Sequence, residues 1–473
     1  MAKQHNANDI RINNLSIRSA NAEFDIQPFL VELNIEENIF KTSLTGSIVL
    51  SDSYNIPEKF PLVGEETVDI NITLEGIDSK DSDLHLIINP PRMHVNSITG
   101  RYYSGKTPKA QMFTIELVSE QYMSNIHSKV SKSYNNVIIS DIVSDIYSKY
   151  LGNPDKLNFE KTERTESCII PNLHPLEAIK WVTKRAVQES GAGVNYLFFE
   201  SLSGVYFLSI NKMAEEQPQF TYKYIPRTAD HTGVEALSKG EFRISQLYFM
   251  SQFDKESNSI NGLYASKLIT HDIVRKKITQ YDFNGYNDFV SLNHFGTYPT
   301  INSSEMEIKS ADLPRVTYAP PEDDNNFPVT TQKDLSDMTD SHVVFYPKHK
   351  QMYSKNTNEE YDNKVETWKL QRNSQIKSFD NITLIIESTG NPFLRVGHTV
   401  NIEIPSTEST DSDKSSDDVY DKHLSGTYLV TSIKHVFQQI EAKDKKITYT
   451  MKVEVVKDAL EDIVQNRTAK KED

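Results

Sequence analysis

The beginning and the end of this chain carry three similar stretches of alternating residues, in the same order. PLVGEETVDINI at 61–72 resembles FLRVGHTVNIEI at 393–404, MHVNSITG at 93–100 resembles YLVTSIKH at 428–435, and FTIELV at 113–118 resembles MKVEVV at 451–456. Each stretch alternates apolar and polar residues, which is the pattern of an antiparallel strand with one face in a core. Three matches in one order therefore predict two related antiparallel β-barrels, one near each end of the chain.

The apolar residues of the matched strands are expected to fill the cores of the two barrels. They are Val68, Ile70, Ile72, Ile115 and Leu117 in the first barrel, and Val400, Ile402, Ile404, Val453 and Val455 in the second. A slip of one residue would turn every one of these side chains to solvent, so matched sequences predict matched strand faces.

Between the two repeats the pattern changes to a mixture of helices and strands. Residues 140–152 and 175–191 carry apolar stripes at helical spacing, and 194–210 contains two apolar runs joined by a Ser-Leu-Ser-Gly turn. The expected fold class is therefore mainly β, with an α+β middle unit between the two barrels.

The same patterns divide the chain into seven parts. The part 281–363 and the loop 405–422 inside the second barrel are polar and weakly periodic, so they cannot supply a core. The expected parts are a flexible N-terminal tail (1–20), the first barrel (21–120), the α+β middle domain (121–239), strands linking to the second barrel (240–280), a polar insertion (281–363), the second barrel (364–456, with the acidic loop 405–422), and a short helix with a frayed C-terminal tail (457–473).

Charge and cysteine content exclude several classes of protein. The 473 residues include 51 Lys and Arg against 66 Asp and Glu, a net charge of −15. Proteins that grip nucleic acid depend on excess Lys and Arg, although an acidic protein can let DNA pass without holding it. Cys168 is the only cysteine, so an intrachain disulfide and a thiolate zinc site are excluded. No secretory signal and no membrane span are expected, because no long apolar run occurs.

No motif predicts a catalytic residue, a metal site or a cofactor site. Residues 189–193 are glycine-rich but lack the Lys and Ser or Thr of a phosphate-binding loop. The aspartates of 411–418 lack the central Gly and the closing Glu of a calcium loop. HExxH and GxSxG motifs are absent from the sequence. We therefore expect a protein that is not an enzyme.

Taken in order, five segments resemble the baseplate hub proteins of contractile-tailed bacteriophages. They are LVGEETVDINI, PLEAIKWVTKRAVQESGAGVNYLFFESLSGVYFLSI, NPFLRVGHTVNIEIP, and the pair GTYLVTSIKHVFQQ and KITYTMKVEVV. The most specific pieces are the second of these segments and the start of a strand marked by Pro392, Leu394 and Gly397. The same fold forms the upper part of the VgrG spike of type VI secretion. VgrG chains continue into a glycine-rich spike, so here a spike is expected to be a separate polypeptide.

The resemblance implies a structural role in the tail baseplate of a virion, assembled in the host cytoplasm as a late protein. Three copies would form a hollow homotrimer whose six tube-like barrels match a hexameric tail tube, with a three-fold central spike on the other side. Its partners would be the spike, the tail tube or tube-initiator proteins and the baseplate wedge proteins, and DNA would cross the channel at ejection. Two other functions stay open: a peripheral receptor-binding tail protein, and a tail-associated cell-wall hydrolase.

Overall fold

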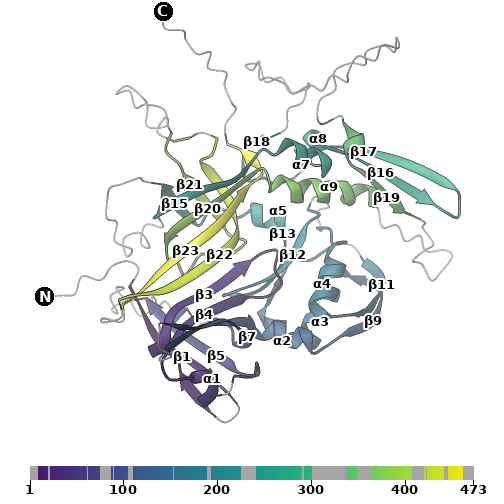
Figure 1. Ribbon diagram of the computed structural model, residues 1–473. Coiled ribbons are helices and arrows are strands. Elements are labelled where there is room, and N and C mark those ends of the chain that lie inside the picture. The colour runs from purple at the N-terminus through teal and green to yellow at the C-terminus, as the bar shows by residue number, and fades with distance from the viewer. Residues whose placement is uncertain are drawn as a thin grey trace, which may run out of the picture.

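The fold is known from a computed structural model and is dominated by β-strands (Figure 1). This confirms the mainly β class. The structure describes residues 9–461 except for 20–21, 61, 75–86, 89, 105–109, 153, 164, 189–192, 225–240, 290–291, 301–335, 337, 349–364, 407–419, 422 and 442–445.

The first curved sheet is built from the N-terminal strands. Its members are β1 (Asp9–Arg18), β3 (Leu30–Asn38), β4 (Thr45–Asp52), β5 (Thr67–Leu74), β7 (Met93–Ser104) and β8 (Ala110–Ser119), with the short β2 (Glu23–Asp25) and β6 (Ile87–Ile88) beside them. The strands pair in the order β1, β5, β7, β8, β4, β3. The short helix α1 (Ile56–Lys59) follows β4.

The second set of strands closes on itself. Its members are β14 (Phe220–Tyr224), β15 (Glu241–Gln252), β20 (Ile382–Thr389), β21 (Thr399–Glu403), β22 (Gly426–Glu441) and β23 (Lys446–Lys457). Pairing runs from β22 through β23, β20, β15, β14 and β21 back to β22. The long hairpin β22–β23 also reaches the first sheet, where β22 pairs with β3 and β23 pairs with β1 (Figure 1).

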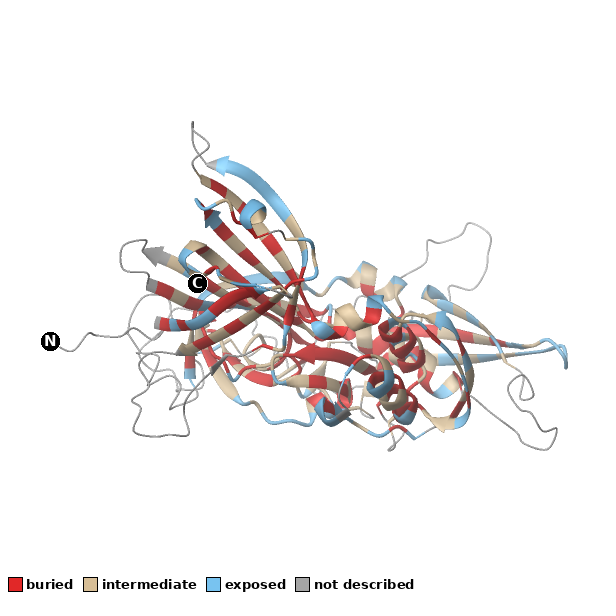
Figure 2. Cartoon of the chain, turned by 90° about the horizontal axis from the view of Figure 1, so that it is seen from below, coloured by how far each residue is buried: buried red, intermediate tan, exposed pale blue. Residues whose placement is uncertain are grey.

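One continuous apolar core runs through both sets of strands. Buried and less buried residues alternate along β8 and β20, and the same banding is visible on the long strands in Figure 2. All ten residues expected in the barrel cores are buried, each with no more than 6% of its surface exposed. The period-two pattern places them there because every second side chain of a strand points to the same face.

The middle unit has a small core of its own. Its elements are α2 (Glu120–Ile126), β9 (Val130–Ile138), α3 (Ile139–Tyr150), β10 (Leu157–Phe159), β11 (Thr165–Leu173), α4 (Pro175–Thr183), β12 (Tyr196–Ser201), β13 (Gly204–Ser209) and α5 (Ile210–Ala214). The buried carboxylate of Glu200 on β12 accepts hydrogen bonds from the Leu44 amide at 3.0 Å and the Ser119 hydroxyl at 2.5 Å. These bonds tie the middle unit to the first sheet.

A third group of elements lies to one side (Figure 1). It contains α7 (Lys255–Ile260), the sheet of β16 (Ala265–Asp272), β17 (Lys277–Asn284) and β19 (Val343–Pro347), then α8 (Gly285–Phe289), β18 (Tyr298–Pro299), α9 (Val365–Ser378) and β24 (Ala459–Leu460). Strands β16 and β17 project as a ribbon whose outer residues are exposed.

The structure corrects several expected boundaries. Residues 9–18, expected in a flexible tail, form β1 because Ile12, Leu15 and Ile17 pack into the core. Residues 241–252, expected to link to the second barrel, are one of its strands. Residues 459–460, expected in a short helix, form a strand paired with β18.

Two polar regions also differ from expectation. The 281–363 region carries α8, β18 and β19 among its described residues. Of the acidic loop 405–422, Pro405 and Tyr420 form an isolated bridge, and residues 407–419 lie outside the described residues.

Candidate assembly interface

Strand pairs of the first sheet recur in the second with the same register. Val95 lies opposite Leu117, and Ile98 opposite Ile115. The residues matched to them by sequence, Val430 with Val455 and Ile433 with Val453, lie opposite one another in the same way. Each strand pair also has a bulge directly after its first valine, Val95 or Val430. A shared bulge is informative because bulges are specific features of a strand pair.

The correspondence extends to strands whose sequences show no clear match. Leu33 on β3 lies opposite Ile48 on β4, and Leu247 on β15 lies opposite Ile386 on β20. Both pairs have a register shift in the same place, after Leu30 and after Ile244. Strands β3, β4, β5, β7 and β8 therefore correspond to β15, β20, β21, β22 and β23.

The strand start marked by Pro392, Leu394 and Gly397 also has a counterpart. All three residues are buried, and Gly397 has φ +85, in the region that favours glycine. Gly64, which precedes β5, has φ +94. A Cβ atom on Gly397 would lie 3.1 Å from Phe199 Cζ of the middle unit, so this turn needs glycine for its backbone and for its packing.

The two sets of strands are joined where β3 pairs with β22. The pairing runs from Asn38 opposite Ser432 to Glu32 opposite Gln438. Across this junction a Glu37 carboxylate oxygen lies 3.1 Å from His435 Nε2, and His435 Nδ1 lies 2.8 Å from the Tyr449 hydroxyl. All three side chains are fully buried, which makes the junction a specific contact with a defined register.

Strands β15 and β7 correspond to the junction strands β3 and β22. The segments of β15 and β7 that match the junction have free edges in the described part of the chain. Within the described residues, no strand pairs with 97–103 of β7 on the side away from β8. The same is true of 246–252 of β15 on the side away from β20. Five large side chains on these edges are between 47% and 66% exposed: Tyr102, Tyr103, Tyr248, Phe249 and Met250. An unpaired strand edge with apolar side chains is a template for pairing with another chain.

The repeated registers define which residues of the free edges are equivalent to those of the junction. Lys434 lies opposite Glu36, and Val436 opposite Asn34. Thr99 and Tyr102 of β7 pair with residues of β8, and Lys434 and Val436 of β22 pair with the matching residues of β23. Thr99 is therefore equivalent to Lys434, and Tyr102 to Val436. In the same way, pairing with β4 and with β20 makes Ser251 equivalent to Glu36, and Tyr248 equivalent to Asn34. A second junction would thus place Thr99 opposite Ser251 and Tyr102 opposite Tyr248.

These edges are the functional feature that the sequence analysis missed. The apolar run Tyr248-Phe249-Met250 is a signal that was available, because such a run on both faces of a strand requires an explanation. Strand β15 could not be matched to β3 from sequence, since the apolar positions of the two strands differ. Only the pairing registers reveal the match.

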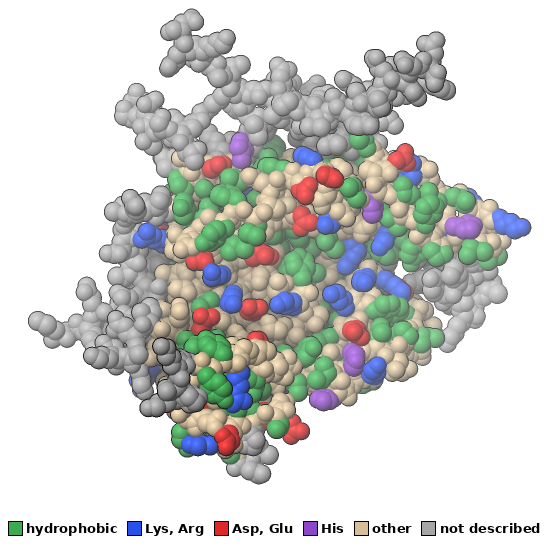
Figure 3. Space-filling view, in the orientation of Figure 1, with side chains coloured by type: hydrophobic (Ala, Val, Ile, Leu, Met, Phe, Trp, Pro, Cys, Tyr) green, Lys and Arg blue, Asp and Glu red, His purple; other side chains and the backbone are tan. Residues whose placement is uncertain are grey.

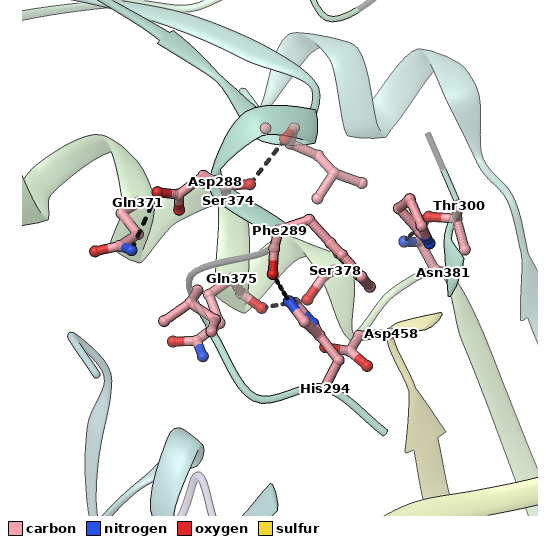
Figure 4. A pocket seen from close by; sticks show the side chains of 14 residues that line it. Asp288, Phe289, His294, Thr300, Gln371, Ser374, Gln375, Ser378, Asn381 and Asp458 are labelled. Carbon is pink, nitrogen blue, oxygen red and sulfur yellow. Dashed lines mark hydrogen bonds and ion pairs between the residues drawn. The ribbon is translucent and has the colours of Figure 1, made fainter. Parts of the chain in front are cut away.

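A small cavity lined in part by α8 and α9 contains a His–Asp pair (Figure 4). His294 Nδ1 lies 2.6 Å from an Asp458 carboxylate oxygen, and His294 Nε2 lies 2.8 Å from the Phe289 carbonyl. Burial opposes protonation of His294, but the hydrogen bond and charge of Asp458 outweigh it and raise its pKa. The nearby Ser374 and Ser378 hydroxyls donate to backbone carbonyls. Both imidazole nitrogens are occupied, so this pair anchors β24 and leaves no basic nitrogen for a reaction.

The described part of the chain has neither a metal-binding cluster nor a membrane-spanning helix. There, no group of three or more His, Cys, Asp or Glu residues is placed to hold a metal ion. No helix of that part is long and apolar enough to cross a bilayer.

Comparison with known proteins gives one sequence relative and several similar structures. No protein-family model matches the chain. The probable baseplate hub protein of Vibrio phage KVP40 is 20% identical over 299 residues, which cover 62% of this chain and 67% of that protein. A tail protein from Neisseria meningitidis has 9% identity and a TM-score of 0.49, over 94% of this chain and 96% of that chain. The 43 kDa tail protein of prophage MuSo2 from Shewanella oneidensis has 9% identity and a TM-score of 0.48, over 94% and 100%.

The family resemblance rests on the phage relative alone, because the similar structures have TM-scores below 0.5. This relative confirms what the order of segments in the sequence predicted: this chain resembles the baseplate hub proteins of contractile-tailed phages.

Proposed function

We propose that this chain is a structural baseplate hub protein that assembles with copies of itself in a head-to-tail ring. The observation that carries the proposal is the junction between β3 and β22. Among the described residues it is formed once, and the corresponding segments of β15 and β7 have no paired strand there. Pairing the β15 edge of one copy with the β7 edge of the next would repeat the junction between copies and cover both of these free edges.

Three copies would complete the ring. Each chain contributes two corresponding sets of strands, so a homotrimer has six similar units around one axis. Such a ring has three-fold symmetry by its chains and approximate six-fold symmetry by its units. It can therefore face a six-fold tail tube on one side and a three-fold spike on the other. The tube, the spike and the surrounding wedge proteins would be its partners in the tail baseplate. The hollow centre would form part of the channel through which DNA leaves at ejection.

The structure gives less support to the two other functions. A cell-wall hydrolase needs an available acid or base in a cleft, and in the described residues the one buried His–Asp pair is fully engaged. A peripheral receptor-binding protein has no need for matched free edges at opposite ends of a duplicated fold. The edges therefore favour the hub.

The position of the protein in assembled tails tests this function. Electron cryomicroscopy of tail particles carrying this chain should show it on the tail axis, between tube and spike. A matched particle with a tag on the exposed β16–β17 turn, at residues 273–276, would mark its density. A peripheral, off-axis position would exclude the hub and favour the receptor-binding function.

A further inference from the structure

A groove of about 630 Å³ lies on the face of the molecule shown in Figure 3, between α4 and α9. Its walls come from the turn after β3, from α4 and its end, from β12 and β19, and from α9. Phe40 belongs to the turn after β3, Trp181 and Lys184 to α4 and its end, and Lys369 and Arg372 to α9. Because regular elements supply most of the wall, the groove is formed before any ligand arrives.

The groove gathers positive charge in a chain whose net charge is −15. Among the described residues, five cations line it and no Asp or Glu does: Lys180, Lys184, Arg185, Lys369 and Arg372. Figure 3 shows Lys and Arg side chains grouped over this region. Arg185 pairs with Glu166 at 2.7 Å, and Arg372 donates to the Val194 carbonyl at 2.9 Å. Lys180, Lys184 and Lys369 have no carboxylate partner among the described residues.

Burial and the neighbouring positive charges disfavour the protonated form of Lys369. Burial lowers the pKa of Lys369, and the charges of Arg372 and Lys184 lower it further. Burial also lowers the pKa of Arg372 to about 10. An anionic ligand in the groove would relieve this repulsion, so its charge would be bound more strongly than by isolated surface lysines.

Most of the other residues that line the groove are apolar or aromatic, and this surface selects among anionic ligands. Phe40 is 44% exposed, and Leu197 and Ile376 are half-buried beside it. A bare phosphate or carboxylate ion would leave this surface uncovered. A polypeptide segment carrying both carboxylates and an apolar side chain would cover it and pair the lysines.

Nucleic acid fits the groove less well. Bases bind by stacking on exposed aromatic rings. The Arg185 guanidinium already lies over Trp181, 4.3 Å from the ring centre, and Trp368 is only 6% exposed. The acidic remainder of the chain would repel a phosphate backbone on either side.

We propose that this groove docks an acidic segment of a partner polypeptide, with at least two carboxylates beside one apolar anchor. The segment's carboxylates would pair with Lys184 and Lys369, and its anchor would cover Phe40. The proposal concerns a surface away from the β7 and β15 edges, so it goes beyond the hub function and does not depend on ring assembly.

Fluorescence anisotropy with the full-length protein tests the proposal. The probe is a dye-labelled ten-residue peptide of Asp and Glu around a single Leu. It should bind in low salt, and peptides with Asn and Gln for Asp and Glu, or with Ser for Leu, should bind at least tenfold more weakly. Replacing Lys184→Glu together with Lys369→Glu should weaken binding of the acidic peptide at least tenfold. The control Lys129→Glu, at an exposed lysine outside the groove, should leave binding unchanged.

Circular dichroism of each variant separates loss of binding from loss of folding. A second variant, Phe40→Ser, tests the apolar anchor and should affect only peptides that contain Leu. Equal binding of acidic and neutral peptides, or unchanged binding by the double variant, would overturn the proposal. Tighter binding of a ten-nucleotide oligo(dT) than of the peptide would assign the groove to nucleic acid instead.

Discussion

Single residues show how far the alternating pattern determines each core. Ile402 is fully buried on β21, where it lies opposite Tyr222 on β14 and Gly426 on β22. Its neighbour Asn401 lies on the other face and is half-buried. A carboxylate at position 402 would be buried without a partner, whereas one at position 401 would stay near solvent.

We therefore expect Ile402→Asp to lower the free energy of unfolding by several kcal/mol. The matched variant Asn401→Asp should lower it by less than about 1 kcal/mol. Chemical denaturation followed by circular dichroism measures both. Similar losses in the two variants would show that the strand faces are assigned wrongly.

His398 makes the turn before β21 sensitive to acid. Its Nδ1 accepts a hydrogen bond from the Arg395 amide at 3.3 Å, which requires the neutral ring. Burial, with a smaller contribution from the Arg395 charge, lowers the pKa of His398 to about 4. Because the ordinary histidine pKa is near 6.5, the unfolded chain takes up the proton first, and stability is lost as the pH falls from about 6.5 to about 4.

The His398→Gln variant should lose this part of the pH dependence. The loss in the natural protein should reach up to about 3 kcal/mol at pH 4, from the shift of the pKa. Unfolding measured at intervals between pH 7 and pH 4 should give a flatter profile for the variant. His271→Gln, at an exposed position on β16, serves as the control. Parallel profiles for the natural protein and His398→Gln would assign the acid sensitivity to other groups.

Among the strands and helices, the edges of β7 and β15 leave backbone hydrogen-bonding groups without a strand partner in the described part of the chain. Tyr102 and Tyr248 are exposed on β7 and β15, in the places that Val436 and Asn34 occupy at the internal junction. In a ring they would face each other across two copies, where an aromatic pair adds to strand pairing.

Aspartate at both tyrosines should therefore prevent assembly without unfolding the chain. We expect Tyr102→Asp with Tyr248→Asp to sediment as a monomer, because like charges directly opposite are destabilising. The melting temperature of the isolated chain should hardly change, since both side chains are exposed. Ile273→Asp, at an exposed position away from both edges, should assemble like the natural protein. Assembly of the double variant at unchanged strength would exclude these edges as the interface.

Elements also show what sequence could and could not predict. The strands around Val68, Ile115, Ile402 and Val453 were predictable because strict alternation specifies both strand and face. Strand β24 was not, because Ala459 and Leu460 are extended through long-range bonds: Asp458 binds His294 and the Phe295 amide. Strand β1 was missed because its polar residues and position at the chain start resemble a tail.

At the scale of the whole molecule, the two sets of strands form one body through the hairpin β22–β23. The ordered segments of the sequence predicted a resemblance to baseplate hub proteins, and the phage relative confirms it. They could not predict which edges meet, because that depends on registers between strands far apart in sequence. In the hub function proposed above, the junction inside the chain would be repeated between copies, so that assembly would close into a ring of three.

Cysteine cross-linking of the assembled protein tests whether β7 and β15 of neighbouring copies pair in this way. In a Cys168→Ser background, Thr99→Cys and Ser251→Cys place one thiol on each free edge, at positions equivalent to Lys434 and Glu36. Oxidation should join each copy to the next and yield a covalent trimer without free thiols, seen by denaturing mass spectrometry. The pairing of Thr99→Cys with Ile273→Cys should give no such product. Covalent dimers alone, or an open ladder of products that never closes at three, would contradict the account.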